Sequence, residues 1–210
     1  MNEFDKWMQS DSSYAVIAQR HPDMIATARL AVTEGFRKSL RQGDNSPAFD
    51  ASRDAFKTLT ATLFKRYAPS MPDEELVNFW RTWFQGIKRV AQGDSSAILA
   101  TLAGGVGIPA DTTANREVGQ AGLRGIAAAI RSPAGVSDSV AVEATRAALI
   151  ARLRTRFGDD VQMLADPLNP AFDRSRSQAV VLTFWDELFA LPDHQAGPFI
   201  RQFAPMSSLP

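Results

Sequence analysis

Apolar residues recur at steps of three and four along most of the chain, which is the spacing of one face of an α-helix. The run at 179–184 could form a buried strand alone, but it lies inside a longer helical pattern. No hairpin dipeptide separates alternating apolar and polar runs. We therefore predict an all-α multi-helix bundle of about seven to nine helices.

Glycine and proline residues mark the ends of most of these helices. The predicted helices cover 23–42, 47–68, 72–92, 113–131, 138–157 and 170–190, with a short helix at 95–103 and a last one holding Phe199, Ile200 and Phe203. In the helix at 23–42 the predicted buried face consists of Ile25, Ala28, Val32, Phe36 and Leu40. The segment from Ser132 to Ser137 is interpreted as a linker, because it contains Pro133 and Gly135.

A second pattern is self-similarity. Residues 47–53 read PAFDASR, and residues 170–176 read PAFDRSR. At the same offset, Leu59-Thr60 corresponds to Leu182-Thr183. A simpler interpretation treats both segments as ordinary helix starts, in which Ser46 and Asn169 cap the helix and each proline takes the first position.

Capping does not explain the shared Ala-Phe and Ser-Arg pairs, so we favour an internal duplication of a three-helix unit. The predicted halves are 23–92 and 138–204, joined by 93–137 within one helical domain, 1–210. Two such halves would pack face to face, and we expect any cleft at the seam between them.

Composition excludes several kinds of chemistry. The 210 residues include 23 Lys and Arg against 23 Asp and Glu, two His and no Cys. A balanced charge is not typical of nucleic-acid binders. Without Cys there is no disulfide, zinc ribbon or iron–sulfur cluster, and two His cannot build a multi-histidine metal site. We expect no metal and no cofactor.

We find no targeting segment. Charged residues interrupt the apolar positions of 1–20, so no signal-peptide core is present there. The longest uncharged run, 95–110, contains three glycines and a proline and is shorter than the about 20 apolar residues that a membrane span needs. We expect a soluble chain without a membrane span, from the cytoplasm or, if an anchor has been removed, from the cell envelope.

Arginines are the first candidates for ligand binding. Arg146, Arg152, Arg154 and Arg156 make the helix at 138–157 basic, and arginine forks suit phosphate or carboxylate groups. Carboxylates nearby in the sequence favour the alternative of a solvated face with salt bridges. As ligand-binding candidates we select Arg53, Arg176, Arg152 and Arg156.

Glycines at 104, 105 and 107 could form a phosphate loop, but no strand precedes them and no Lys-Ser/Thr follows. We interpret this segment as a helix end. The adjacent carboxylate pairs, such as Asp159-Asp160, point in different directions on a helix and show no convergence. No catalytic residue is predicted.

Aromatic residues concentrate around 79–84 and 184–203, in a number too large for one helix face. Most of them are expected in the core. A remainder left on the surface would mark a partner site. The partner-binding candidates are Trp80, Trp83 and Trp185.

Three short segments carry a resemblance: Arg66 to Leu76, Arg156 to Pro167, and Phe189 to Arg201. In these segments the chain resembles the soluble helical part of uncharacterised, sometimes membrane-anchored proteobacterial proteins. The cysteines and the N-terminal anchor of such proteins have no counterpart here. The resemblance implies a bacterial protein with a possible role in the cell envelope and carries no activity.

These observations lead to two expectations of different kinds. The first is a non-enzymatic interaction module that binds a protein partner or itself. The alternative is a binder of a small anionic ligand at the seam between the halves. A third alternative, a helical hydrolase or lyase, stays open because helical enzymes need no short motif.

Overall fold

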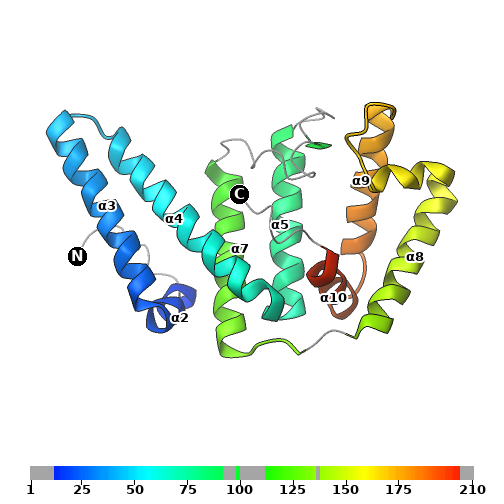
Figure 1. The fold of residues 1–210 in the computed structure, drawn as a ribbon, viewed down its shortest axis with the longest axis horizontal. Helices are drawn as coiled ribbons and strands as arrows, with labels where there is room; N and C mark the ends of the chain where they lie inside the picture. The colour runs from blue at the N-terminus through cyan, green and yellow to red at the C-terminus, as the bar shows by residue number, and fades with distance from the viewer. Residues whose placement is uncertain (1–11, 92–97, 100–111, 136–137, 204–210) are drawn as a thin grey trace.

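In the computed structural model, residues 12–91, 98–99, 112–135 and 138–203 are described. Over these residues the chain forms eight α-helices and no strand, which confirms the predicted all-α bundle (Figure 1). The helices are α2 (Ser12–Arg20), α3 (Pro22–Gln42), α4 (Ser46–Tyr67), α5 (Asp73–Ala91), α7 (Thr112–Arg131), α8 (Ser139–Phe157), α9 (Arg174–Phe189) and α10 (Asp193–Phe203). Two 3-10 turns, η1 (Ala68–Ser70) and η2 (Gly158–Leu164), follow α4 and α8.

Figure 1 shows α3 and α4 as an antiparallel hairpin on one side, α5 and α7 in the centre, and α8, α9 and α10 on the other side. The main core forms where α5 packs on α7 and α10, and where α2 and α4 pack on α7. A smaller apolar cluster joins α8, η2 and α9, and its buried residues are Leu153, Phe157, Val161, Met163 and Val180.

The predicted helix ends agree with the structure to within two residues for the helices from α3 to α8, and α9 starts four residues later than predicted. Neither α2 nor either 3-10 turn was predicted from the sequence. Most of the short helix predicted at 95–103, and the glycines at 104, 105 and 107, lie outside the described residues. No helix within the described ranges combines the length and apolar character needed to cross a bilayer.

The structure does not show the predicted duplication. Pro47 lies in the first turn of α4, whereas its counterpart Pro170 lies in the turn before α9. The cap of α9 is Asp173, which accepts from the backbone N–H of Arg176 at 2.8 Å, so the assignment of Asn169 as the cap is wrong. The matching residue Asp50 lies inside α4. The same letters therefore begin two helices in different ways.

The following helices also pack differently. In the first half α5 packs on α7 and on α10, while in the second half α10 packs on α5 and on α8. Arg201 and Asp73 join α10 to α5, with the guanidinium donating to the Asp73 carboxylate at 2.6 Å and to the Met71 carbonyl at 2.8 Å. Gly197 permits this approach, because a Cβ at that position would lie 2.5 Å from the Cβ of Asp73.

Candidate functional site: the projecting α3–α4 hairpin

The seam between α3 and α4 is built from small residues. On α3 it follows Ala28, Val32, Gly35 and Ser39, all buried. A Cβ on Gly35 would collide with the Ala51 side chain and would lie 2.9 Å from the carbonyl oxygen of Pro47. The two helices therefore lie in close contact, and the contact has no room for large side chains.

This close contact explains a difference from the predicted face of α3. Ile25, Ala28 and Val32 are buried as expected, but Phe36 and Leu40 are exposed. At 3.6 residues per turn, Phe36 and Leu40 lie beside the seam and not in it. Residues spaced by four drift around the helix, so those in the first half of α3 face α4 and the later ones do not.

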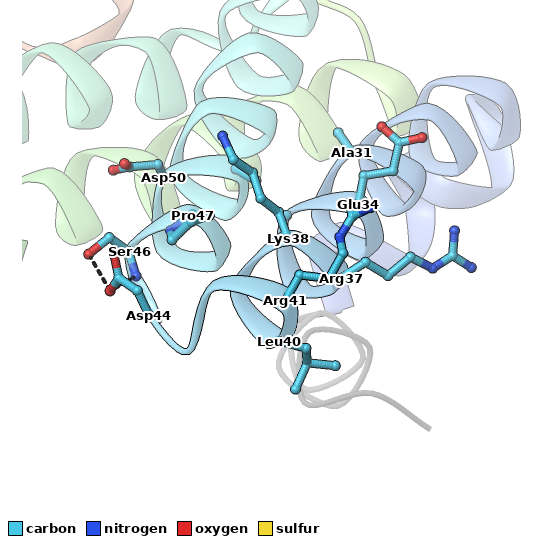
Figure 2. Close-up of a pocket in the computed structure, with 12 residues that line it drawn as sticks. Ala31, Glu34, Arg37, Lys38, Leu40, Arg41, Asp44, Ser46, Pro47 and Asp50 are labelled. Carbon is cyan, nitrogen blue, oxygen red and sulfur yellow. Dashed lines mark hydrogen bonds between the residues drawn. The ribbon is translucent and has the colours of Figure 1, made fainter.

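Two side chains accept hydrogen bonds from backbone N–H groups at the start of α4. The Ser39 hydroxyl accepts a hydrogen bond from the backbone N–H of Ala48 at 2.9 Å, and Asp44 accepts from the backbone N–H of Ser46 at 2.9 Å. The Ser46 hydroxyl also donates to the same Asp44 oxygen (Figure 2). These bonds from Ser46 lower the pKa of the exposed Asp44 carboxyl. The residue in the N-cap position, Asn45, makes no capping bond with its side chain, and Ser46, predicted as the cap, lies inside the helix.

An open groove of about 1050 Å³ lies along the end of the hairpin (Figure 2). Its polar rim carries three cations and three carboxylates: Arg37, Lys38, Arg41, Glu34, Asp44 and Asp50. In Figure 2 Leu40 points away from Lys38 and Asp50, on the other side of α3. The lining contains neither histidine nor cysteine, and its one hydroxyl group, that of Ser46, is bonded to Asp44.

Exposed apolar side chains gather on the same hairpin. Five large hydrophobic residues are exposed in the described part of the chain, and four of them belong to α3 or α4: Leu30, Phe36, Leu40 and Phe49, the fifth being Val140. Leu40 is 84% exposed and Phe49 is 74% exposed. A concentration of this kind on one projecting element is typical of a binding surface.

The three predicted tryptophans lie elsewhere. Trp80 is 3% exposed and Trp83 is also buried, so both are core residues, and their assignment to an exposed patch is wrong. Trp185 is half-buried and stacks on Trp80, with ring centroids 6.0 Å apart. The cluster joins α5 to α9.

Within the part of the chain that the structure describes, the indole N–H groups of Trp80 and Trp83 are buried and make no hydrogen bond. The two rings meet edge to face at 5.1 Å.

The four predicted ligand-binding arginines do not share one site. Arg53 lies on the hairpin, where it pairs with Asp50 and Asp54 at 3.1 Å each. The other three lie on α8 and α9, on the far side of the molecule (Figure 1). The structure therefore does not bring Arg53 and Arg176 together.

On that far side, Arg176 pairs with Asp160 at 2.5 Å and Arg152 with Glu187 at 3.4 Å. The guanidinium groups of Arg156 and Arg176 lie 5.4 and 5.1 Å from the centre of the Phe157 ring. These contacts hold α8, η2 and α9 together. They give the arginines a structural role, and anion binding by them stays a prediction.

A second cavity, of about 640 Å³, lies where α8, α10 and the start of α5 meet. Its polar lining includes Asp73, Arg201, Asp138 and His194. The side chain of Arg201 is only 10% exposed and is bonded to Asp73 and Met71 as described above. Asp138 caps α8 by accepting from the backbone N–H of Val140. Arg201, Asp73 and Asp138 therefore already serve the fold.

No protein-family model matches this sequence, and neither the curated proteins nor the solved structures contain a significant match to it. Fold and site together define a class only: an all-α bundle with a projecting helical hairpin. In the described residues no group of three or more His, Asp or Glu side chains could hold a metal ion.

Proposed function

We propose that the chain is a helical interaction module that binds a protein partner through the end of the α3–α4 hairpin. The observation that carries the proposal is the location of the exposed apolar side chains, of which Phe36, Leu40 and Phe49 lie in its outer part. Burying such side chains against a partner supplies a driving force of about 25 cal/mol per Å² of apolar area.

The same geometry supports binding more than catalysis. The rim of the groove carries equal numbers of cations and carboxylates. Hydrogen bonds within the turn lower the pKa of Asp44 in this groove. Catalytic sites instead bring together groups whose pKa values are shifted by burial and by a specific charged neighbour.

A surface-matched comparison tests this proposal. The double variant Leu40→Ser/Phe49→Ser removes two exposed apolar side chains of the hairpin, and Val140→Ser removes one that is 75% exposed on α8. Tagged forms of the wild type and both variants are used to capture proteins from a lysate of the source organism. The captured protein is then purified and its affinity for each form is measured by calorimetry.

The proposal expects one stoichiometric protein that binds the wild type and Val140→Ser equally and binds the double variant at least about tenfold more weakly. Circular dichroism checks that each variant is folded. Sedimentation velocity shows whether a second copy of the chain is the partner. If the double variant captures and sediments as the wild type does, the hairpin is not the binding element.

A further inference from the structure

Away from α4, helix α3 carries apolar side chains that no other described element buries, interspersed with polar positions such as Arg29 and Thr33. The seam residues Ala28, Val32, Gly35 and Ser39 fall within about 60° of arc and face α4. Leu30, Phe36 and Leu40 fall within a separate arc of about 120°, and each of them is exposed. We call these three residues the outer face of α3.

Positive charge shares this arc. On a helical wheel Arg37 lies between Leu40 and Leu30, and Arg41 lies about 20° beyond Leu30. Both arginines are exposed, and no ion pair within 4.0 Å involves either of them among the described residues. Arg53 on α4, by contrast, is held between two carboxylates.

We propose that the outer face of α3 binds an amphipathic helix with an apolar stripe and acidic flanks, and this proposal rests on the proposed function. The distance along the axis from Leu30 to Leu40 is about 15 Å, or three turns, which suits a partner helix of similar length. An apolar stripe on the partner helix would cover the exposed Leu30, Phe36 and Leu40 side chains. Glutamate or aspartate beside that stripe would meet Arg37 and Arg41.

The arrangement favours a helix over an anionic lipid surface. Glu34 lies about 20° from Arg41 on the wheel, so the arc is bordered by a carboxylate. A second carboxylate, Asp50, follows the exposed Phe49. A broad anionic surface would repel both carboxylates, whereas a narrow helix leaves them in water.

A pair of synthetic peptides tests the proposal with the full chain. Both are fluorescently labelled helices of about 20 residues with leucine at positions a and d, and they differ only in having glutamate or lysine at the flanking e and g positions. Fluorescence anisotropy measures the affinity of each peptide for the wild type, Leu40→Ser and Arg37→Glu/Arg41→Glu. All exchanged residues are exposed, so the variants keep the fold.

The glutamate peptide is expected to bind the wild type at least about tenfold more tightly than the lysine peptide. The double charge reversal is expected to invert this preference, and Leu40→Ser to weaken both peptides. If both peptides bind equally and Leu40→Ser weakens both, the proposal of an acidic partner is refuted. The hairpin would then still be a binding element. Failure of both peptides to bind would overturn the inference, while the capture experiment above decides the proposed function separately.

A vesicle measurement separates the lipid alternative. Wild-type protein is sedimented with vesicles of phosphatidylglycerol and phosphatidylcholine and with vesicles of phosphatidylcholine alone. We expect no sedimentation with either kind. Sedimentation with the anionic vesicles that is lost in Arg37→Glu/Arg41→Glu would assign the outer face to a lipid surface and overturn the proposal.

Discussion

The hydroxyl oxygen of Ser39 lies 2.9 Å from the backbone nitrogen of Ala48 and accepts its hydrogen bond inside the buried seam between α3 and α4. A side chain near the end of one helix thus satisfies an N–H group at the start of the next. The same N–H group also donates to the carbonyl of Asn45, the N-cap residue of α4, at 3.1 Å. The bond between Ser39 and Ala48 fixes how the two helices stand against each other at the outer end of the hairpin.

Replacing Ser39 by alanine is expected to lower the free energy of unfolding by about 0.5–1.5 kcal/mol, because the Ala48 N–H loses the shorter of its two hydrogen bonds and keeps only the one to the Asn45 carbonyl. Urea denaturation of wild type and variant measures the difference. Thr33→Ala is the control, since the Thr33 hydroxyl donates to a carbonyl of its own helix. An equal loss of stability in the two variants would show that the bond between Ser39 and Ala48 contributes no more than a hydroxyl bond within one helix.

Replacing Gly35 by alanine is expected to destabilise the chain by about 1–3 kcal/mol, because the added Cβ collides with Ala51 and approaches the Pro47 carbonyl. Helix propensity alone would favour alanine by about 1 kcal/mol, so the sign of the effect is informative. Thermal unfolding checks it. Ala51→Gly should rescue part of the loss, and Gly135→Ala, which adds a Cβ where nothing lies within 4 Å, should cost little. A stabilising Gly35→Ala would refute the close seam.

Removing the Arg201 guanidinium by Arg201→Met is expected to cost about 1–3 kcal/mol, because the carbonyl of Met71 and the carboxylate of Asp73 lose their donor. Denaturant unfolding measures this loss. The matched control is Arg53→Met, whose ion pairs are exposed and for which we expect a change of at most about 0.5 kcal/mol. If Arg201→Met and Arg53→Met lower the free energy of unfolding equally, the burial of the Arg201 ion pair does not add to its contribution.

The stability of the chain is expected to depend on the protonation of His21. Its Nε2 lies 2.7 Å from the Tyr67 hydroxyl, and desolvation, followed by the charges of Arg66 and Arg20, lowers the pKa of His21 below 6.5. The unfolded chain therefore takes up this proton first as the pH falls. The stability that neutral His21 contributes is fully present above about pH 6.5. It is lost as the pH falls through the lower pKa of His21 in the folded chain.

Urea unfolding at several pH values between about 5 and 8 measures this dependence. His21→Gln should flatten the slope in this range, and His194→Gln is the matched control for a histidine on the other side of the molecule. If His21→Gln leaves the slope as it is in the wild type, a different group governs the pH dependence.

Helical periodicity predicted the fold class and most helix positions, because core-facing side chains in a bundle must follow the period of the helix. It failed on α2, whose nine residues bury only a short apolar face. It also failed on the repeat, since the conformation of PAFD depends on what lies around it. In α4 the segment is held by Ser39 from α3, whereas before α9 Asp173 starts the helix by itself.

The candidate site could not be read from the sequence for a physical reason. Phe36 and Leu40 look like core residues by spacing, and only the close contact at Gly35 shows that the seam passes beside them. Trp80 and Trp83 look like anchors by type, yet they lie in the core. One signal was available: Gly35, Ser39, Ala48 and Ala51 are small residues near a turn, which is typical of two helices in close contact.

Because the seam consists of small residues along both helices, the length of the hairpin sets how far its tip lies from the core. Among the described residues, the outer parts of α3 and α4 are held chiefly by each other. Lengthening both helices by matched turns would therefore move the tip outward by about 5.4 Å for each turn while the core stayed as it is. Insertion of seven residues into each helix would keep the small residues in register, since seven residues make close to two full turns. The reach of this module can thus change by insertions of whole turns, independently of everything that stabilises its body.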